Sequence, residues 1–386
     1  MTQGAWGSGP ATGFLAPAWS SADAAGRTLA DVLPAVARAL GVDLGGHASS
    51  LELPPAPAYV VVLVDGLGHE LLAEHRAQAP YLHSLLGTPP ATCGVPSTTA
   101  TSLTSLGTAL APGQHGLVGF TSRVPATGEL LNALFWDRDV DPLDWQPHPT
   151  AFARLEALGV RTTVVSKREF AGSGLTRCGQ RGAAYVGADD IAERVAGAVA
   201  AAAHRPSLTY VYDGDLDWHG HRAGVDSQRW RGQLRDVDED VQELRDALPP
   251  EVRIVVVADH GMVDCGPETR VDVDVLPGLR DGVTLLGGEA RFRHVYCHDG
   301  AVDDVAATWR EVLGERATVL TREQATARGW FGPVDAGVRP RIGDVVAAAH
   351  GTWGLFSTTD FAYETTLVGL HGSLTPQEML IPLLVC

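Results

Sequence analysis

Seven side chains in this sequence have the types needed to hold metal ions and to activate a hydroxyl group. The first is Thr99, in the hydroxyl-rich stretch Pro96-Ser97-Thr98-Thr99, directly before a segment of helical pattern that extends to Leu110. A hydroxyl at a loop-to-helix junction lies beside unpaired backbone N–H groups and the positive end of the helix dipole, where it can hold a phosphate or act as a nucleophile. A threonine there also serves as the N-cap of a buried helix, so this stretch alone leaves both roles open.

The other six candidates are acidic and imidazole side chains near the ends of expected strands. Taken singly, an Asp–Gly or His–Gly pair is equally typical of an ordinary turn. Asp217 and His221 carry more weight because they are four residues apart, although the neighbouring Asp213, Asp215 and His219 remain alternatives. Mixed carboxylate and imidazole ligands suit zinc or another borderline divalent ion better than calcium or magnesium. The set is large enough for two adjacent ions: Asp65, Asp217, His221, Asp259, His260 and His371.

The elements that must position these residues are indicated by hydrophobic pattern. Continuous apolar runs predict buried parallel strands over residues 59–65, 160–166, 207–212 and 253–258. Helical patterns separate them, at 25–40, 69–86, 99–110, 151–158, 189–204 and 227–248. This alternation predicts an α/β fold with a doubly wound, mostly parallel sheet flanked by helices. Ligand groups gather at the carboxyl ends of such strands, where Asp65, Asp217 and Asp259 fall.

The chain organisation is predicted from shifts in composition. Residues 1–24 are rich in Gly, Pro, Ala and Ser and are expected to form an irregular arm before a catalytic domain over residues 25–386. The βα pattern weakens at about 266–340, which we interpret as an inserted cap with a hairpin at 287–300 and a helix at 302–313. A further strand is expected at 343–349.

Charge and cysteine usage limit the classes of partner. With 29 basic and 46 acidic residues the formal net charge is −17, so no nucleic-acid polymer is expected as a partner, and a phosphate substrate needs a local positive site such as bound metal ions. Five dispersed cysteines argue against a disulfide framework and against a thiolate zinc site. There is no secretory signal pattern and no apolar run long enough to span a membrane, so we expect a cytoplasmic protein without a membrane partner.

Together these motifs resemble the alkaline phosphatase superfamily, and within it the nucleotide pyrophosphatase/phosphodiesterase-like branch. That branch has a strand ending in Asp-Gly, a Pro-[Ser/Thr]-x-Thr nucleophile motif and a His-Gly pair about 16 residues later, which match Asp65-Gly66, Pro96 to Thr99 and His115-Gly116. It continues with D-x-x-G-H, a strand ending in DHGM, and a late His-Gly followed by an apolar strand with proline. These match residues 217–221, 259–262, 371–372 and 379–382, in the family order.

The resemblance implies two divalent ions, with zinc expected. One would be held by Asp217, His221 and His371, and the other by Asp65, Asp259 and His260 with the Thr99 hydroxyl. Thr99 would attack phosphorus, and the phosphothreonine formed would then be hydrolysed. The substrate implied is a small phosphate ester, with cleavage of a phosphodiester or pyrophosphate bond of nucleotide type.

The sequence departs from the family pattern three residues after Thr99. The branch usually has an asparagine there that donates to a phosphate oxygen, whereas this chain has Ser102, which we predict takes over that role through its hydroxyl. Two alternatives therefore remain: a phosphomonoesterase or phosphonate hydrolase of the same superfamily, and a non-catalytic metal-binding module. The second alternative predicts the loss of a ligand or of the nucleophile, and none is missing. Phe120, Trp136 and Trp145 are aromatic residues that could stack on a nucleobase or simply pack.

Overall fold

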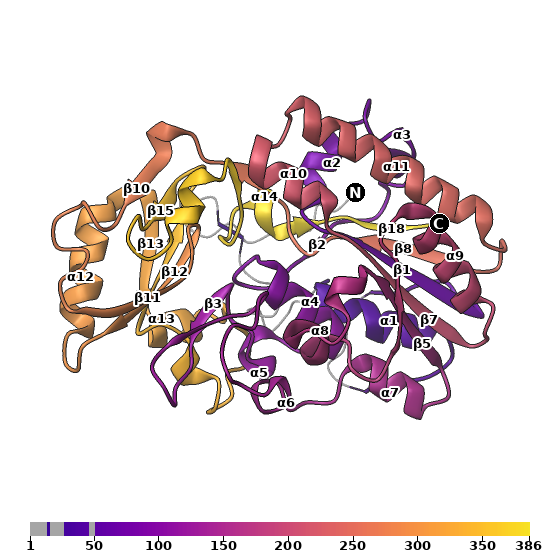
Figure 1. Ribbon diagram of the computed structural model, residues 1–386, viewed down its shortest axis with the longest axis horizontal. Coiled ribbons are helices and arrows are strands. Elements are labelled where there is room, and N and C mark those ends of the chain that lie inside the picture. The colour runs from indigo at the N-terminus through magenta and orange to yellow at the C-terminus, as the bar shows by residue number, and fades with distance from the viewer. Residues whose placement is uncertain (1–13, 16–26, 46–50) are drawn as a thin grey trace, which may run out of the picture.

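The computed structural model describes residues 14–15, 27–45 and 51–386, so the predicted irregular arm at 1–24 lies almost wholly outside the described residues. Its centre is a six-stranded sheet in the order β18-β8-β1-β7-β5-β6 (Figure 1). The four predicted strands are present as β1 (Ala58–Val64), β5 (Arg161–Ser166), β7 (Ser207–Asp213) and β8 (Arg253–Val257). They are parallel, as is β6 (Ala184–Gly187), while β18 (Leu383–Val385) pairs antiparallel with β8 at the edge.

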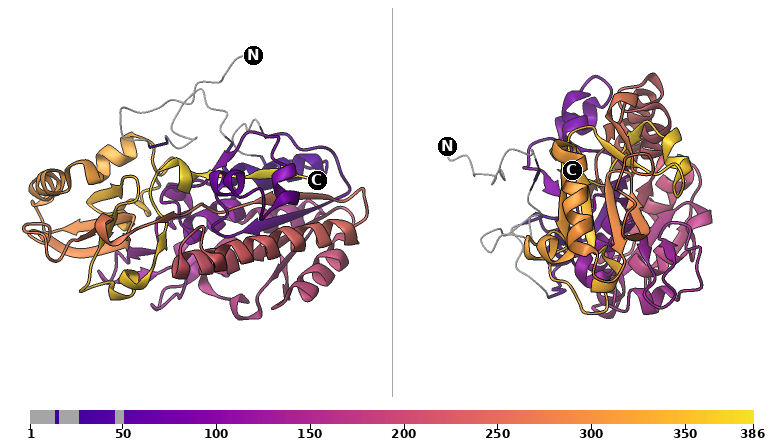
Figure 2. Two further views of the ribbon diagram at one scale, coloured as in Figure 1. Left: turned by 90° about the horizontal axis from the view of Figure 1, so that it is seen from above. Right: turned by 90° about the vertical axis from the view of Figure 1, so that its left-hand side faces the viewer.

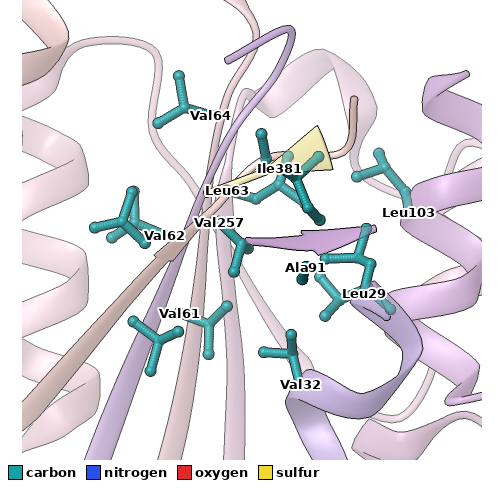
Figure 3. Packing of buried hydrophobic residues seen from close by; sticks show 14 of the residues in the cluster. Leu29, Val32, Val61, Val62, Leu63, Val64, Ala91, Leu103, Val257 and Ile381 are labelled. Carbon is teal, nitrogen blue, oxygen red and sulfur yellow. The ribbon is translucent and has the colours of Figure 1, made fainter. Parts of the chain in front are cut away.

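Helices cover both faces of this sheet, which confirms the predicted α/β class. One face is covered by α9 (Ile191–Ala202) and α11 (Gln228–Ala247), and the other by α1 (Val32–Ala39), α4 (Thr99–Thr108) and α7 (Ala151–Ala157). All seven residues of β1 are buried, because successive side chains point to opposite faces and both faces are covered. Figure 3 shows Leu63 on the side of Leu29 and Leu103, with Val62 and Val64 on the opposite side.

The helix predicted over residues 69–86 is two helices in the structure, α2 (His69–Glu74) and α3 (Pro80–Ser84). The break has a local cause. A proline disfavours the helical conformation of the residue before it, and Ala79 has φ −129° and ψ 64°. Pro80 itself takes the first position of α3, where its missing N–H costs no hydrogen bond.

A second sheet lies at one end of the molecule (Figure 2). It is antiparallel, in the order β11-β12-β14-β13, with β11 at Val283–Glu289, β12 at Phe292–Cys297, β13 at Ala317–Thr321 and β14 at Val345–Ala349. The predicted hairpin corresponds to β11 and β12, and the predicted helix to α12 (Val302–Leu313), whereas β13 and α13 (Arg322–Ala327) were not predicted. Because β14 belongs to this sheet and β10 (Arg270–Asp272) pairs with β15 (Gly354–Phe356), the segment reaches beyond the predicted limit of residue 340.

Shorter elements connect these layers. They are β2 (Ala91–Thr92), α5 (Pro112–His115), β3 (Thr121–Arg123), β4 (Leu130–Asn132), α6 (Pro142–Trp145), α8 (Gly174–Gly179), α10 (Asp215–Ala223), β9 (Val263–Asp264), β16 (Gly369–Leu370), α14 (Pro376–Met379) and β17 (Leu380–Ile381). Within the described ranges, no helix combines the length and the apolar character needed to cross a bilayer.

Candidate active site

Two buried carboxylates lie at the carboxyl ends of the adjacent parallel strands β1 and β8. Asp65 follows β1 and Asp259 follows β8, with 2% and 0% of their surfaces exposed. The backbone N–H of Gly66 donates to Asp259 Oδ1 at 3.1 Å, and the N–H of Asp65 donates to the Asp213 carbonyl at 2.8 Å. A bond to the Asp259 side chain therefore joins the end of β1 to the end of β8, and a backbone bond joins it to the end of β7.

The segment Asp217-Trp-His-Gly-His221 folds as part of helix α10. Residues four apart lie on one face of a helix, and Asp217 Oδ2 is 3.2 Å from His221 Nε2. Gly66, at φ +75°, allows α10 to approach the end of β1, because a Cβ atom there would lie 3.0 Å from the Cβ of Asp217. A side chain at residue 66 would push the carboxylate of Asp217 away from that of Asp65.

Thr99 is the first residue of α4, a helix whose ten residues are all buried. Two hydroxyl groups inside this helix are satisfied locally, since Thr104 and Thr108 donate to carbonyls one turn earlier at 2.8 and 2.7 Å. The Thr99 hydroxyl instead faces the strand ends, 3.3 Å from His260 Nε2 and 3.5 Å from Asp65 Oδ2. The nucleophile candidate and two ligand candidates therefore share one small space.

His371 and the residue after it are hydrogen-bonded to Ser97, two residues before Thr99. Its Nδ1 lies 2.9 Å from the carbonyl oxygen of Ser97. The Ser97 hydroxyl donates to the Ser373 carbonyl at 2.7 Å and accepts from the Gly372 N–H at 3.1 Å. The His371 ring stacks on His260, with ring centroids 3.6 Å apart. Ser97, which the sequence did not mark as functional, thus fixes the position of His371.

All three histidines turn the same nitrogen into the site. The Nδ1 atoms of His221, His260 and His371 lie 2.8, 3.0 and 2.9 Å from backbone carbonyls. Because a carbonyl oxygen accepts only, each Nδ1 carries hydrogen and each Nε2 faces inward, the arrangement typical of metal-ligating histidines. Burial and the neighbouring His260 hold the pKa of His371 well below its usual range. His371 Nε2 is 3.2 Å from His221 Nε2, a distance that requires a proton or a metal cation between them.

One oxygen of each carboxylate at the same place lacks a partner. Asp65 Oδ1, Asp217 Oδ1 and Asp259 Oδ2 are buried and accept no hydrogen bond from the described residues. Burial raises the pKa of Asp65 well above its usual range, and the charges of Asp259 and Asp217 raise it further. The pKa of Asp259 is raised by burial and by Asp217, although His260 opposes this. Burial also raises the pKa of Asp217, but His221 and His371 outweigh it and the net shift is downward. Crowded carboxylates that each keep an unpaired oxygen, beside imidazoles whose Nε2 faces inward, fit divalent cations.

The ligand atoms form two compact groups, each within 4.8 Å: Asp217, His221 and His371 in one, and Asp65, Asp217 and His260 in the other. The first matches the set expected for one ion. The second differs from expectation because Asp217 replaces Asp259, whose Oδ2 lies 3.2 Å from His260 Nε2. Asp217 therefore lies between the two groups, a position that spacing in the sequence could not indicate.

Two of the three alternative ligands near α10 are engaged elsewhere. Asp213 pairs with Arg194, and Asp215 accepts from Lys167 at 2.7 Å. The His219 ring packs against Trp218, with ring centroids 4.8 Å apart. None of these three belongs to either ligand group.

His115, from the His-Gly pair after α4, has a structural position. It is fully buried, and burial lowers its pKa to about 3. Its Nδ1 accepts from the Leu117 N–H at 3.2 Å, and Nε2 lies 2.9 Å from the Ser105 hydroxyl. These bonds hold the turn that follows α4.

Ser102 does not occupy the place predicted for it. Its side chain is fully buried, its hydroxyl has no hydrogen-bond partner among the described residues, and it is absent from the lining of the cavity beside Thr99. Three residues along a helix correspond to a rise of about 4.5 Å, which takes Ser102 into the packed body of α4 rather than its open end. We therefore correct the prediction and give Ser102 no contact with substrate.

A cavity of about 820 Å³ opens beside Thr99, Asp65, Asp217, His221 and His371. Six aromatic residues are part of its lining: Phe120, Phe135, Phe170, Tyr212, Trp218 and Tyr363. Of the three aromatic residues that the sequence suggested for stacking, only Phe120 lines this cavity. Trp136 and Trp145 instead pack edge to face against each other, with ring centroids 6.5 Å apart.

The sequence also gave no sign of Glu289, which the second sheet brings to the cavity. It ends β11, is 8% exposed, and places Oε2 4.0 Å from His371 Nδ1. Burial raises its pKa to about 8, although the Thr98 hydroxyl acts in the opposite direction. Gly372, at φ +127°, makes room for it, because a Cβ there would lie 2.9 Å from the Glu289 Cγ. A lone Glu in a hairpin has no motif by which it could be recognised.

Comparison with known proteins identifies a family and similar folds. The family model for type I phosphodiesterase/nucleotide pyrophosphatase matches residues 59–374. The fold is similar to murine ectonucleotide pyrophosphatase/phosphodiesterase 5, at 19% identity and a TM-score of 0.66, covering 85% of this chain and 87% of that chain. It is also similar to phosphonoacetate hydrolase from Sinorhizobium meliloti 1021 in complex with phosphonoformate, at 21% identity and a TM-score of 0.64, covering 86% and 90%. No curated protein sequence matches the chain.

The chain therefore belongs to the type I phosphodiesterase/nucleotide pyrophosphatase family, within the alkaline phosphatase superfamily. It is an enzyme of the phosphoric ester hydrolase class, as the resemblance implied. Enzymes of this family use divalent metals, and the two ligand groups are where this chain can hold them.

Proposed function

We propose that this protein cleaves phosphodiester or pyrophosphate bonds of small, nucleotide-type substrates through a phosphothreonine intermediate on Thr99. The observation that carries the proposal is the position of the Thr99 hydroxyl, at the start of α4 and within 3.5 Å of both Asp65 and His260. The proposed ligands are Asp217, His221 and His371 for one ion and Asp65, Asp259 and His260 for the other, with Asp217 available to both. The −17 net charge agrees with a small substrate rather than a nucleic-acid polymer.

Two zinc ions bound at these residues would supply positive charge for the phosphoryl oxygens and would lower the pKa of a hydroxyl nucleophile. The protein chain orients the Thr99 hydroxyl toward the phosphorus atom. The Thr99 hydroxyl attacks phosphorus in line, the bond to the leaving oxygen breaks, and water later cleaves the Thr99 ester. The first N–H groups of α4 lie beside the reacting phosphoryl group and favour its negative charge.

A relative supports the nucleophile assignment. Murine ectonucleotide pyrophosphatase/phosphodiesterase 5, in an inactive variant with one threonine replaced by alanine, was solved in complex with AMP. A threonine that is required for activity and a bound nucleotide monophosphate in that protein agree with the roles proposed for Thr99 and for the cavity beside it.

A second candidate is hydrolysis of a phosphomonoester or a phosphonate by the same residues. It is favoured by the similarity to phosphonoacetate hydrolase and by the burial of Ser102, which leaves the expected donor to a diester oxygen without a counterpart in the α4 motif. We place this candidate second because the matched family is defined by phosphodiesterases and nucleotide pyrophosphatases.

The test is a paired rate assay on the purified protein. The p-nitrophenyl ester of thymidine 5′-monophosphate is compared with p-nitrophenyl phosphate, before chelation, after chelation and after zinc is added back. The proposal predicts chelator-sensitive, zinc-restored turnover with the higher kcat/KM for the diester. A higher kcat/KM for the monoester would support the second candidate, and a lack of turnover of both by the zinc-loaded protein would contradict each of them.

We also retain the proposal of a cytoplasmic location. All five cysteines are unpaired, and four of them are buried, which agrees with a reducing compartment. A disulfide in protein purified from its natural source would contradict it.

A further inference from the structure

Glu289 is a buried carboxylate that the described residues do not fully satisfy. The Thr98 hydroxyl and the Phe120 N–H approach it, but its Oε1 accepts no hydrogen bond from the described residues. Burial of an acid without a partner is costly, and buried polar groups left unpaired often mark a binding function. The backbone is shaped to keep it there, because Gly372 leaves the space that the Glu289 side chain fills.

The proposed metal ions are not the missing partner. Glu289 belongs to neither ligand group, and it lies on the Nδ1 side of His371, whereas the ligand atoms of those groups meet the opposite nitrogen. Its carboxylate instead lines the cavity on the side formed by the second sheet.

Aromatic rings lie on the same side. Phe120 and Tyr363 line the cavity with ring centroids 6.2 Å apart, and the Phe120 backbone N–H approaches Glu289. Ring faces beside a carboxylate are the usual surroundings of a bound ammonium group. Among the residues that line the cavity Arg222 is the sole Arg or Lys, and its guanidinium lies over the Trp218 ring at 4.0 Å. The cavity therefore has little positive charge with which to bind a second anionic group. It does have an open hydrogen-bond acceptor for a cation.

We propose that Glu289 binds a positively charged amine on the organic group of the substrate, with Phe120 and Tyr363 enclosing it. The inference rests on the proposed function and deepens it, since it names the substrate class as amine-bearing phosphate esters. Glu289 is then a specificity-determining residue that the second sheet contributes to the active site.

The test is run at pH 9, above the pKa of about 8 to which burial raises Glu289, so that its carboxylate is charged while the amine keeps its proton. It uses two esters that differ in one group, 2-aminoethyl p-nitrophenyl phosphate and propyl p-nitrophenyl phosphate, in which a methyl group replaces the ammonium. The zinc-loaded native protein is expected to show a kcat/KM about tenfold or more higher for the aminoethyl ester, the size expected of a charged hydrogen bond. Glu289→Gln should bring this ratio close to one. Glu169→Gln, a change at another glutamate of the cavity wall, should keep it.

Turnover of both esters by the native protein at a ratio near or below one would overturn the role of Glu289 and leave the proposed function standing. Where turnover is too slow to compare, calorimetric titration of the Thr99→Ala variant with each ester gives the same answer through binding. Tighter binding of the aminoethyl ester, lost in the Thr99→Ala/Glu289→Gln variant, supports the inference, and equal binding overturns it. Failure of the proposed function would be seen separately, as lack of turnover of the nucleotide ester.

Discussion

Both ligand groups depend on Asp217, because its carboxylate belongs to each of them. The sequence named it from its spacing to His221, and the structure adds that it lies between the two candidate ion positions. Spacing could not reveal this, since it reflects the approach of α10 to the ends of β1 and β8. The same limit applied to Ser102, whose type was suitable but whose place one turn into α4 is buried.

The shared position of Asp217 gives a prediction for metal binding. Zinc added to the chelator-treated protein should raise its unfolding temperature by a few degrees, because a ligand that binds the native state stabilises it. Asp217→Asn should remove more than half of this increase. Asp215→Asn, two residues away and paired with Lys167, is the control and should retain it. An equal zinc-dependent increase in both variants, measured by scanning calorimetry, would contradict the assignment of Asp217.

Glu289 gives a prediction for the pH dependence of the metal-free protein. Its pKa in the folded state is about 8, above the ordinary value of 4.5, so the folded state retains this proton to higher pH than the unfolded chain does. Stability from this group is present below about pH 4.5 and is lost as the pH rises through about 8. Between pH 6 and pH 9 the free energy of unfolding should fall by about 2–3 kcal/mol more in the native protein than in Glu289→Gln. Urea unfolding at both pH values measures this, and identical pH dependence of the two proteins would contradict it.

At the scale of elements, the central sheet was the most predictable part. The continuous apolar runs that became β1, β5, β7 and β8 have few ways to be buried other than as covered parallel strands. The boundaries of helices and strands, and breaks within them, were harder to predict, as the division of the expected 69–86 helix near Ala79 shows. Helix α10 was not predicted because its charged, glycine-containing sequence is held by packing against α11 and the strand ends rather than by helix propensity.

The link between α4 and the loop of His371 gives an element-scale prediction. Ser97→Ala removes a hydroxyl that bonds the Ser373 carbonyl and the Gly372 N–H, at a cost of about 1–3 kcal/mol in stability. Because these bonds position His371, the variant should also bind zinc more weakly. Ser105→Ala, which loses a comparable buried bond to His115, is the matched control. Loss of stability in both variants with equal zinc affinity, by calorimetric titration, would show that Ser97 has a structural role alone.

At the scale of the whole molecule, the second sheet is joined to the active-site region by a buried ion pair. Arg291, from the hairpin between β11 and β12, pairs with Glu378 at 2.6 Å, and both side chains are 0% exposed. Glu378 also accepts from the Ser373 N–H at 2.9 Å, near His371. The weak pattern at 266–340 allowed a cap to be predicted but not its attachment, because pairs so distant in sequence leave no local signal.

This attachment predicts that two similar substitutions lower the free energy of unfolding by different amounts. Arg291→Met leaves Glu378 buried without its charge partner and should destabilise the protein by about 3–5 kcal/mol. Arg339→Met breaks a pair of the same length, 2.6 Å to Glu323, but both of those side chains are about half exposed, so its cost should stay within about 1 kcal/mol. Chemical unfolding of the two variants measures the difference, and similar costs would contradict the view that the buried pair anchors the second sheet.

The central claim is that Thr99 forms a covalent phosphoryl ester during turnover. It is tested most directly by acid quenching the zinc-loaded protein during steady-state cleavage of the p-nitrophenyl ester of thymidine 5′-monophosphate, followed by peptide mass spectrometry. We predict a thymidine 5′-phosphoryl group on the peptide that contains Thr99, at the Thr99 position, and its absence in Thr99→Ala together with loss of turnover but not of bound zinc. An unmodified Thr99 peptide in actively turning-over protein, or normal turnover by Thr99→Ala, would contradict the account.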